Sequence, residues 1–93
     1  MAVTVRIPTQ LRSLTGGTGE VSVEATTVGE ALKALDARHP GFHERLFDDA
    51  GALRRFVNVF VSEEDIRFSE GLGTPVADGQ TLSIVPAVAG GAV

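Results

Sequence analysis

The sequence contains no cysteine, no tryptophan and no tyrosine, so its five phenylalanines are all of its aromatic residues. Without cysteine, the chain can form no disulfide bond, no thiolate nucleophile and no thiolate metal site. Any sulfur chemistry in which this protein takes part must therefore use sulfur that its side chains do not supply.

Long apolar runs and clustered positive charge are also missing. No segment approaches the ~20 apolar residues of a membrane span, and the start of the chain lacks a basic leader followed by a long apolar run. Lysine and arginine number 8 against 12 acidic residues, giving a net charge of −4. Nucleic acid and anionic membranes both reward concentrated positive charge. We therefore expect a cytoplasmic protein whose partners are neither nucleic acid nor membrane.

What the sequence does contain is a set of strand patterns. Apolar and polar residues alternate in four segments, as in strands that bury one face. These segments are residues 3–7, 20–25, 56–61 and 80–86, and a further short strand is expected at Ile66-Arg67-Phe68. The third segment places valines on one face and mainly aromatic residues on the other: Val57, Val59 and Val61 against Phe56, Asn58 and Phe60.

One segment has the pattern of an amphipathic helix. Thr27-Val28-Gly29-Glu30 has the form of a capping box, in which the Thr27 hydroxyl accepts from the Glu30 amide and the Glu30 carboxylate reaches back to the Thr27 amide. Apolar residues then recur at helical spacing, namely Val28, Ala31, Leu32 and Leu35. Pro40 ends this helix, because the residue before a proline avoids the α region. Residues 42–47 are expected to form a second, short helical turn.

The order of these elements predicts an α+β fold of the β-grasp (ubiquitin-like) kind. A chain of 93 residues has room for one core, and one helix of about three turns must cover one face of a mixed sheet to close that core. The first and last strands are expected to pair in the centre of the sheet. We predict a β-grasp domain over residues 1–86 and a flexible C-terminal tail over residues 87–93.

The tail is the most informative segment. Residues 85–93 carry no charged or polar side chain, whereas disordered ends are usually polar. Gly90 and Gly91 have no side chains, so the backbone can enter a slot too narrow for any other residue. A chain that ended at Gly91 would offer an unhindered carboxylate to a reacting partner, but Ala92 and Val93 block that carboxylate until they are removed.

The order of elements and the ending together resemble the small ubiquitin-like sulfur carriers of the ThiS/MoaD family. The last strand is introduced by Asp78-Gly79 and is followed by Gly90-Gly91. Several runs look most like the carriers of the thiocarboxylate route to cysteine, the CysO type. They are Ile7-Pro8-Thr9 with Leu11-Arg12, Arg55-Phe56-Val57-Asn58, Asp65-Ile66-Arg67-Phe68 and Pro86-Ala87-Val88-Ala89-Gly90-Gly91.

The resemblance implies a carrier, not an enzyme, with no bound cofactor. An E1-like activating enzyme would use ATP to adenylate Gly91, and a sulfur donor would convert it to a thiocarboxylate. In the cysteine route a PLP-dependent cysteine synthase would use that thiocarboxylate, and a metal-dependent peptidase would release the product. The segment implied to enter partner active sites is Pro86, Ala87, Val88, Ala89, Gly90 and Gly91. Ala92 and Val93 depart from the family pattern, so a peptidase is expected to trim them.

Other interpretations stay open from the sequence. The same tail would serve a carrier for thiamin, molybdopterin or sulfur-containing natural products, a ubiquitin-like modifier linked to target lysines, or a binding module with an inert tail. Phe56, Asn58 and Phe60 form a candidate docking face, unless residues 42–47 or a loop cover them. His39 and His43 are four residues apart, but Pro40 interrupts a continuous helix between them, so we predict no metal site. We find no catalytic set of side chains.

Overall fold

The computed structural model describes residues 2–86. Met1 and residues 87–93 lie outside the described residues, and with them the predicted tail, including Gly90, Gly91, Ala92 and Val93.

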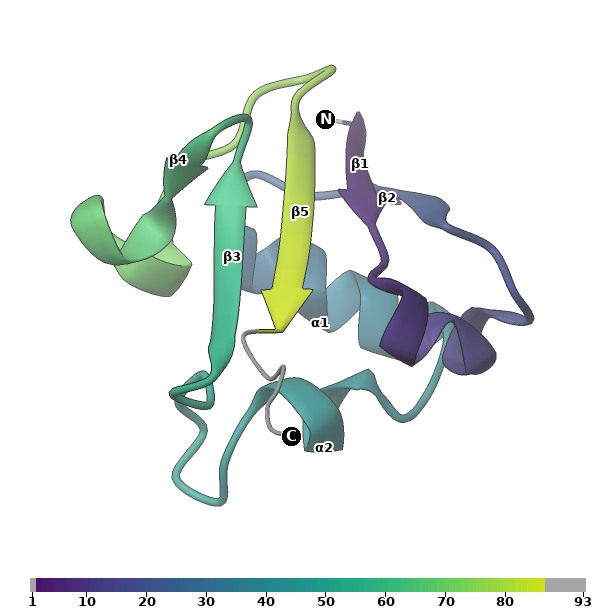
Figure 1. Cartoon of the computed structure of the whole chain (residues 1–93). Helices are drawn as coiled ribbons and strands as arrows, with labels where there is room; N and C mark the ends of the chain where they lie inside the picture. Colours follow the sequence, from purple (N-terminus) through teal and green to yellow (C-terminus); the bar gives the residue numbers. More distant parts are fainter. Residues whose placement is uncertain (1, 87–93) are drawn as a thin grey trace.

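The described residues form a five-stranded mixed sheet in the order β2-β1-β5-β3-β4. Its strands are β1 Ala2–Arg6, β2 Glu20–Glu24, β3 Val57–Val61, β4 Glu64–Asp65 and β5 Thr81–Pro86. β1 pairs antiparallel with β2 and parallel with β5, and β5 pairs antiparallel with β3. The predicted central pairing of the first and last strands is confirmed, and with it the α+β, β-grasp fold (Figure 1).

A single long helix, α1 Val28–Arg38, covers one face of this sheet (Figure 1). Its predicted apolar stripe is buried, and so are the valines of β3 and the inward-facing residues of β1 and β5. The two sets share one core, whose main members are Val3, Val5, Val28, Ala31, Leu32, Leu35, Val57, Val59, Val61, Leu82 and Ile84. The helical spacing of the apolar residues in α1 and their alternation in the strands therefore place both sets of side chains in the same core.

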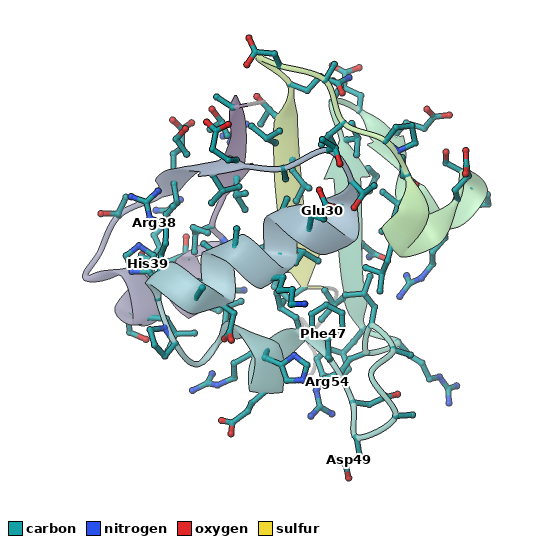
Figure 2. All side chains as sticks on the ribbon, turned by 180° about the vertical axis from the view of Figure 1, so that it is seen from behind. Glu30, Arg38, His39, Phe47, Asp49 and Arg54 are labelled. Atoms are coloured by element: carbon teal, nitrogen blue, oxygen red, sulfur yellow. The ribbon has the colours of Figure 1, made fainter. Side chains whose placement is uncertain are left out.

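The first turn of α1 is capped by side chains. The Thr27 hydroxyl accepts from the Glu30 amide at 3.2 Å, as predicted. The Glu30 carboxylate, however, accepts mainly from the amide and the hydroxyl of Thr26, at 2.8 and 2.6 Å, where the sequence predicted the Thr27 amide. Thr26 offers two donors to one carboxylate oxygen, which explains the preference. Figure 2 shows Glu30 at this end of α1 and Arg38 and His39 at the other, where the helix ends as predicted.

This cap gives a pH-dependent prediction. Hydrogen bonds from the Thr26 hydroxyl, then from its amide, lower the pKa of Glu30. A lowered folded-state pKa means that the carboxylate stabilises the fold fully above its unfolded-state pKa, and that this contribution is lost as the pH falls through the folded-state pKa. Glu30→Gln is therefore expected to lower the free energy of unfolding at neutral pH, and the difference from wild type should vanish in acid.

Urea unfolding of both proteins across the acid range measures this difference. Glu63→Gln is the matched control, because Glu63 is exposed at the turn between β3 and β4. A deficit of Glu30→Gln that persisted unchanged in acid would contradict the assigned role of the charge.

The predicted strand at Ile66-Arg67-Phe68 is wrong. These residues form a 3-10 helix, η2 Ile66–Phe68, and the preceding Glu64–Asp65 is what pairs with β3. The Asp65 carboxylate accepts from the Arg67 amide at 2.8 Å and starts the turn. This local hydrogen bond uses the Arg67 amide, which in a strand would have donated to a carbonyl of the neighbouring strand.

The remaining connections contain short helices. Two further 3-10 helices are η1 Thr9–Thr15, inside the β1–β2 connection, and η3 Gly71–Gly73. α2 Phe42–Leu46 confirms the predicted second helical turn, and it buries Phe42 and Leu46. No helix among residues 2–86 is long and apolar enough to cross a membrane.

Candidate functional site at the end of strand β5

The site begins where β5 ends. β5 lies between β1 and β3, and its last residue, Pro86, is paired with Val57 at the start of β3. Gly91 is the fifth residue after Pro86. Because an extended chain spans at most ~3.5 Å per residue, the five residues after Pro86 could place Gly91 at most about 17 Å from Pro86. That length allows a partner to take Gly91 into a channel while the sheet stays outside.

Two hollows meet at Pro86. One has a volume of about 410 Å³ and a mainly apolar lining that includes Leu11, Leu46, Phe56 and Ile84. The other, of about 420 Å³, lies between the end of β5 and the segment from Arg6 to Arg12. Pro86 thus lies where two concave surfaces meet, which gives a partner protein a shape to recognise at the end of β5.

The predicted docking face lies beside the apolar hollow. Phe56 is 50% exposed, whereas Asn58 and Phe60 are half-buried on the sheet face opposite α1. Asn58 stands opposite Val85 of β5, which is 43% exposed and extends this face toward Pro86. Helix α2 directs Phe42 and Leu46 into the core and leaves Phe56 half exposed. The face is therefore open at Phe56 and partly covered at Asn58 and Phe60.

Arg67 is a residue of this region whose role the sequence did not reveal. Its guanidinium donates to the carbonyls of Val57, Arg54 and Arg55, at 2.8, 3.2 and 3.3 Å, and to the side-chain oxygen of Asn58. Val57 and Asn58 begin β3, and Arg54 and Arg55 precede it in the segment that carries Phe56. Arg67 consequently links the start of β3 to the segment before it, which carries Phe56 of the predicted docking face, although nothing in a lone arginine signals such a role.

We expect Arg67→Lys to destabilise the fold by about 1–3 kcal/mol, since hydrogen bonds to a charged group contribute on this scale. A lysine ammonium cannot reproduce the planar fork that reaches several acceptors at once. Urea unfolding measures the loss. Arg55→Lys makes the same chemical change at an exposed neighbour and should be neutral. Equal stability of the two variants would show that the Arg67 network contributes nothing.

The two histidines considered from the sequence, His39 and His43, do not line either hollow of this site. The ring of His43 stacks on Phe47 with centroids 5.1 Å apart, and the His43 amide donates to Asp36. Within residues 2–86 there is no group of three or more histidine and acidic side chains that could hold a metal ion. Arg54, by contrast, lines the apolar hollow and donates to the Glu44 carbonyl at 3.1 and 3.3 Å, below α1 in the view of Figure 2.

Comparison with known proteins identifies close relatives. The ThiS family profile matches residues 5–91, so the match ends at Gly91 and leaves Ala92 and Val93 outside it. The sulfur carrier protein CysO of Mycobacterium tuberculosis is 52% identical over 93 residues, covering 98% of this chain and 100% of its own.

Solved structures give the same result. A chain of the BexX/CysO complex of Amycolatopsis orientalis superposes with a TM-score of 0.89 at 50% identity, covering 96% of this chain and 99% of that one. SAMP1 of Haloferax volcanii, a small archaeal modifier protein, superposes with a TM-score of 0.84 at 32% identity. The match covers 98% of this chain and 100% of that one.

Proposed function

The chain belongs to the ThiS family, and from this premise we propose that it is a sulfur carrier protein acting at Gly91. After removal of Ala92 and Val93, the Gly91 carboxyl group is adenylated, converted to a thiocarboxylate and used as a sulfur donor in cysteine biosynthesis. The observation that carries the proposal is that the family match runs through the whole domain and stops at Gly91. The 52% identity to a named sulfur carrier over nearly the full length supports it.

The chemistry explains why activation is needed. A terminal carboxyl group has a pKa of about 3.5, so at neutral pH it is an anion and a poor acyl donor. Attack of the carboxylate on the α-phosphate of ATP forms an acyl adenylate and releases pyrophosphate. A sulfide-level donor then displaces AMP, and the sulfur remains on Gly91 as a thiocarboxylate. The protein supplies the reacting carboxyl group and the surface by which it is presented, and the activating enzyme consumes the ATP.

The proposed partners follow from these steps. They are an E1-like activating enzyme, a PLP-dependent cysteine synthase that accepts the sulfur, and a metal-dependent peptidase, all in the cytoplasm. The BexX/CysO complex supports the idea that a carrier of this kind docks on a partner protein. Here the half-exposed Phe56 and the apolar hollow beside Pro86 are the surfaces we assign to docking.

The direct test is reconstitution. The chain ending at Gly91 is incubated with ATP, sulfide and the activating enzyme of the same organism, and its intact mass is recorded. Exchange of one oxygen for sulfur is the expected result, and the chain ending at Val93 should remain unmodified. Equal reaction of the two forms, or no sulfur in either, would refute adenylation at Gly91.

A second candidate function is protein modification. The similarity to a small archaeal modifier protein favours it, because the same activated Gly91 can form an amide bond with a lysine. Only the fate of the acyl group separates the two functions. Conjugates of higher mass that survive reducing, denaturing gels would support the modifier, whereas free thiocarboxylate consumed by a synthase supports the carrier.

A further inference from the structure

Half of the positively charged residues of this acidic chain lie around Pro86, the last residue of β5. Of its 8 lysine and arginine residues, Arg6 and Arg12 line one of the hollows at Pro86, and Arg45 and Arg54 line the other. We call these four residues the arginine collar. They come from four places in the sequence, and only the sheet order and the position of α2 bring them to the same end of β5.

Among residues 2–86, the charge of the collar is largely uncompensated by neighbouring carboxylates. Arg12 and Arg54 donate to the backbone carbonyls of Ile7 and Glu44, which fix the guanidinium groups without neutralising them. Arg6 lies 4.0 Å from the Glu20 carboxylate, but both side chains are about two-thirds exposed, and such pairs contribute little in water.

The lining of the two hollows also has an excess of positively charged residues. Glu44 is the single acidic residue among the residues that line them, against the four arginines. The guanidinium groups thus lie around concave, partly apolar surface with their charge available to a partner.

The opposite end of the sheet has the opposite charge. A hollow of about 600 Å³ beyond the start of β5 is lined by Glu63, Glu64 and Glu70, with no lysine or arginine in its lining. The protein therefore carries a charge asymmetry along β5, positive where the tail leaves and negative at the far end. A field of this kind orients a protein before contact, over distances comparable to the ~8 Å Debye length at physiological salt.

We propose that the arginine collar docks on an acidic rim around the mouth of the channel by which the activating enzyme receives the tail. This inference rests on the proposed function, because it assumes that Gly91 is delivered into an enzyme. Arginine is suited to such a rim, since its planar fork binds carboxylates through two parallel hydrogen bonds.

The surroundings of the collar favour a protein partner. Apolar residues such as Leu46 and Phe56 lie between the arginines, giving the apolar centre and polar rim typical of protein interfaces. A polyanion such as nucleic acid would make no use of that centre and would be repelled by the net charge of −4.

The test compares two double variants of equal net charge. Arg6→Glu/Arg45→Glu reverses two collar charges, whereas Lys33→Glu/Arg38→Glu makes the same change on α1, away from Pro86. Stopped-flow measurements give the association rate constant of each chain, ending at Gly91, with the activating enzyme at several salt concentrations. Far-UV circular dichroism verifies that both are folded, and the corresponding glutamine variants provide a milder pair.

We expect the collar variant to associate about tenfold more slowly than the α1 variant at low salt, and the difference to disappear at high salt. Equal rates for the two variants would overturn the proposed role of the collar. Adenylation of the wild-type chain by the same enzyme with ATP, measured in parallel as pyrophosphate release, would leave the proposed function standing. Failure of the wild-type chain to be adenylated would instead refute the proposed function, and the collar inference with it.

Discussion

Gly91→Ala, in a chain that ends at residue 91, is expected to fold like the wild type and to be adenylated on the order of 100-fold more slowly. A glycine pair suits a slot in which the backbone is enclosed on all sides, and a methyl group in that slot displaces the carboxylate from the α-phosphate of ATP. A displacement of about 1 Å is enough for a loss of this size.

The pyrophosphate released with ATP and the activating enzyme measures the effect. Gly73→Ala is the matched control, since a Cβ at Gly73 meets no atom within 4 Å and its backbone needs no positive φ. That variant should be adenylated at the wild-type rate. Normal adenylation of Gly91→Ala would refute the narrow slot, though not the role of the carboxyl group.

Leu32→Ala is expected to lower the free energy of unfolding by about 2–5 kcal/mol, as truncations of core leucines do. Leu32 is 1% exposed in the middle of the α1 stripe, where it belongs to the core shared with the sheet. The loss is large beside a total stability of about 5–15 kcal/mol for a typical domain. Once folded, the variant should still be adenylated, because Leu32 is buried in the core and lines neither hollow at Pro86.

Urea unfolding gives the free energy, and adenylation is measured where the variant is folded. Lys33→Ala, one position along α1 and exposed, should change stability by well under 1 kcal/mol. An unchanged unfolding midpoint for Leu32→Ala would mean that the stripe is not what holds α1 on the sheet.

The fold could be predicted because local patterns and tertiary packing agree. The alternation in residues 57–61 places the valines under α1, and the helical spacing of Val28 to Leu35 places the matching stripe above them. The prediction failed at Ile66–Phe68, where residues with high strand propensity form a 3-10 helix. There a short-range hydrogen bond, from the Arg67 amide to Asp65, outweighs the propensity.

The candidate site could be proposed from the sequence only where a contiguous motif defines it. Gly91 could be proposed because Gly90-Gly91 stands shortly after the last strand, separated from it only by Ala87-Val88-Ala89. Arg67 could not, since its acceptors lie at Arg54 and Val57, more than nine residues away. The arginine collar combines positions from residue 6 to residue 54, which no sequence window contains. Such features depend on strand order and register, and a single sequence shows them only after folding.

The measurement that tests the sulfur-carrier proposal most directly is the intact mass of the untagged protein isolated from the cells that naturally produce it. We predict a chain that ends at Gly91, lacking Ala92 and Val93, with a fraction in which one oxygen is replaced by sulfur. A chain that keeps Val93 while the pathway is active, with no sulfur-bearing fraction, would contradict the proposal and favour a binding module with an inert tail.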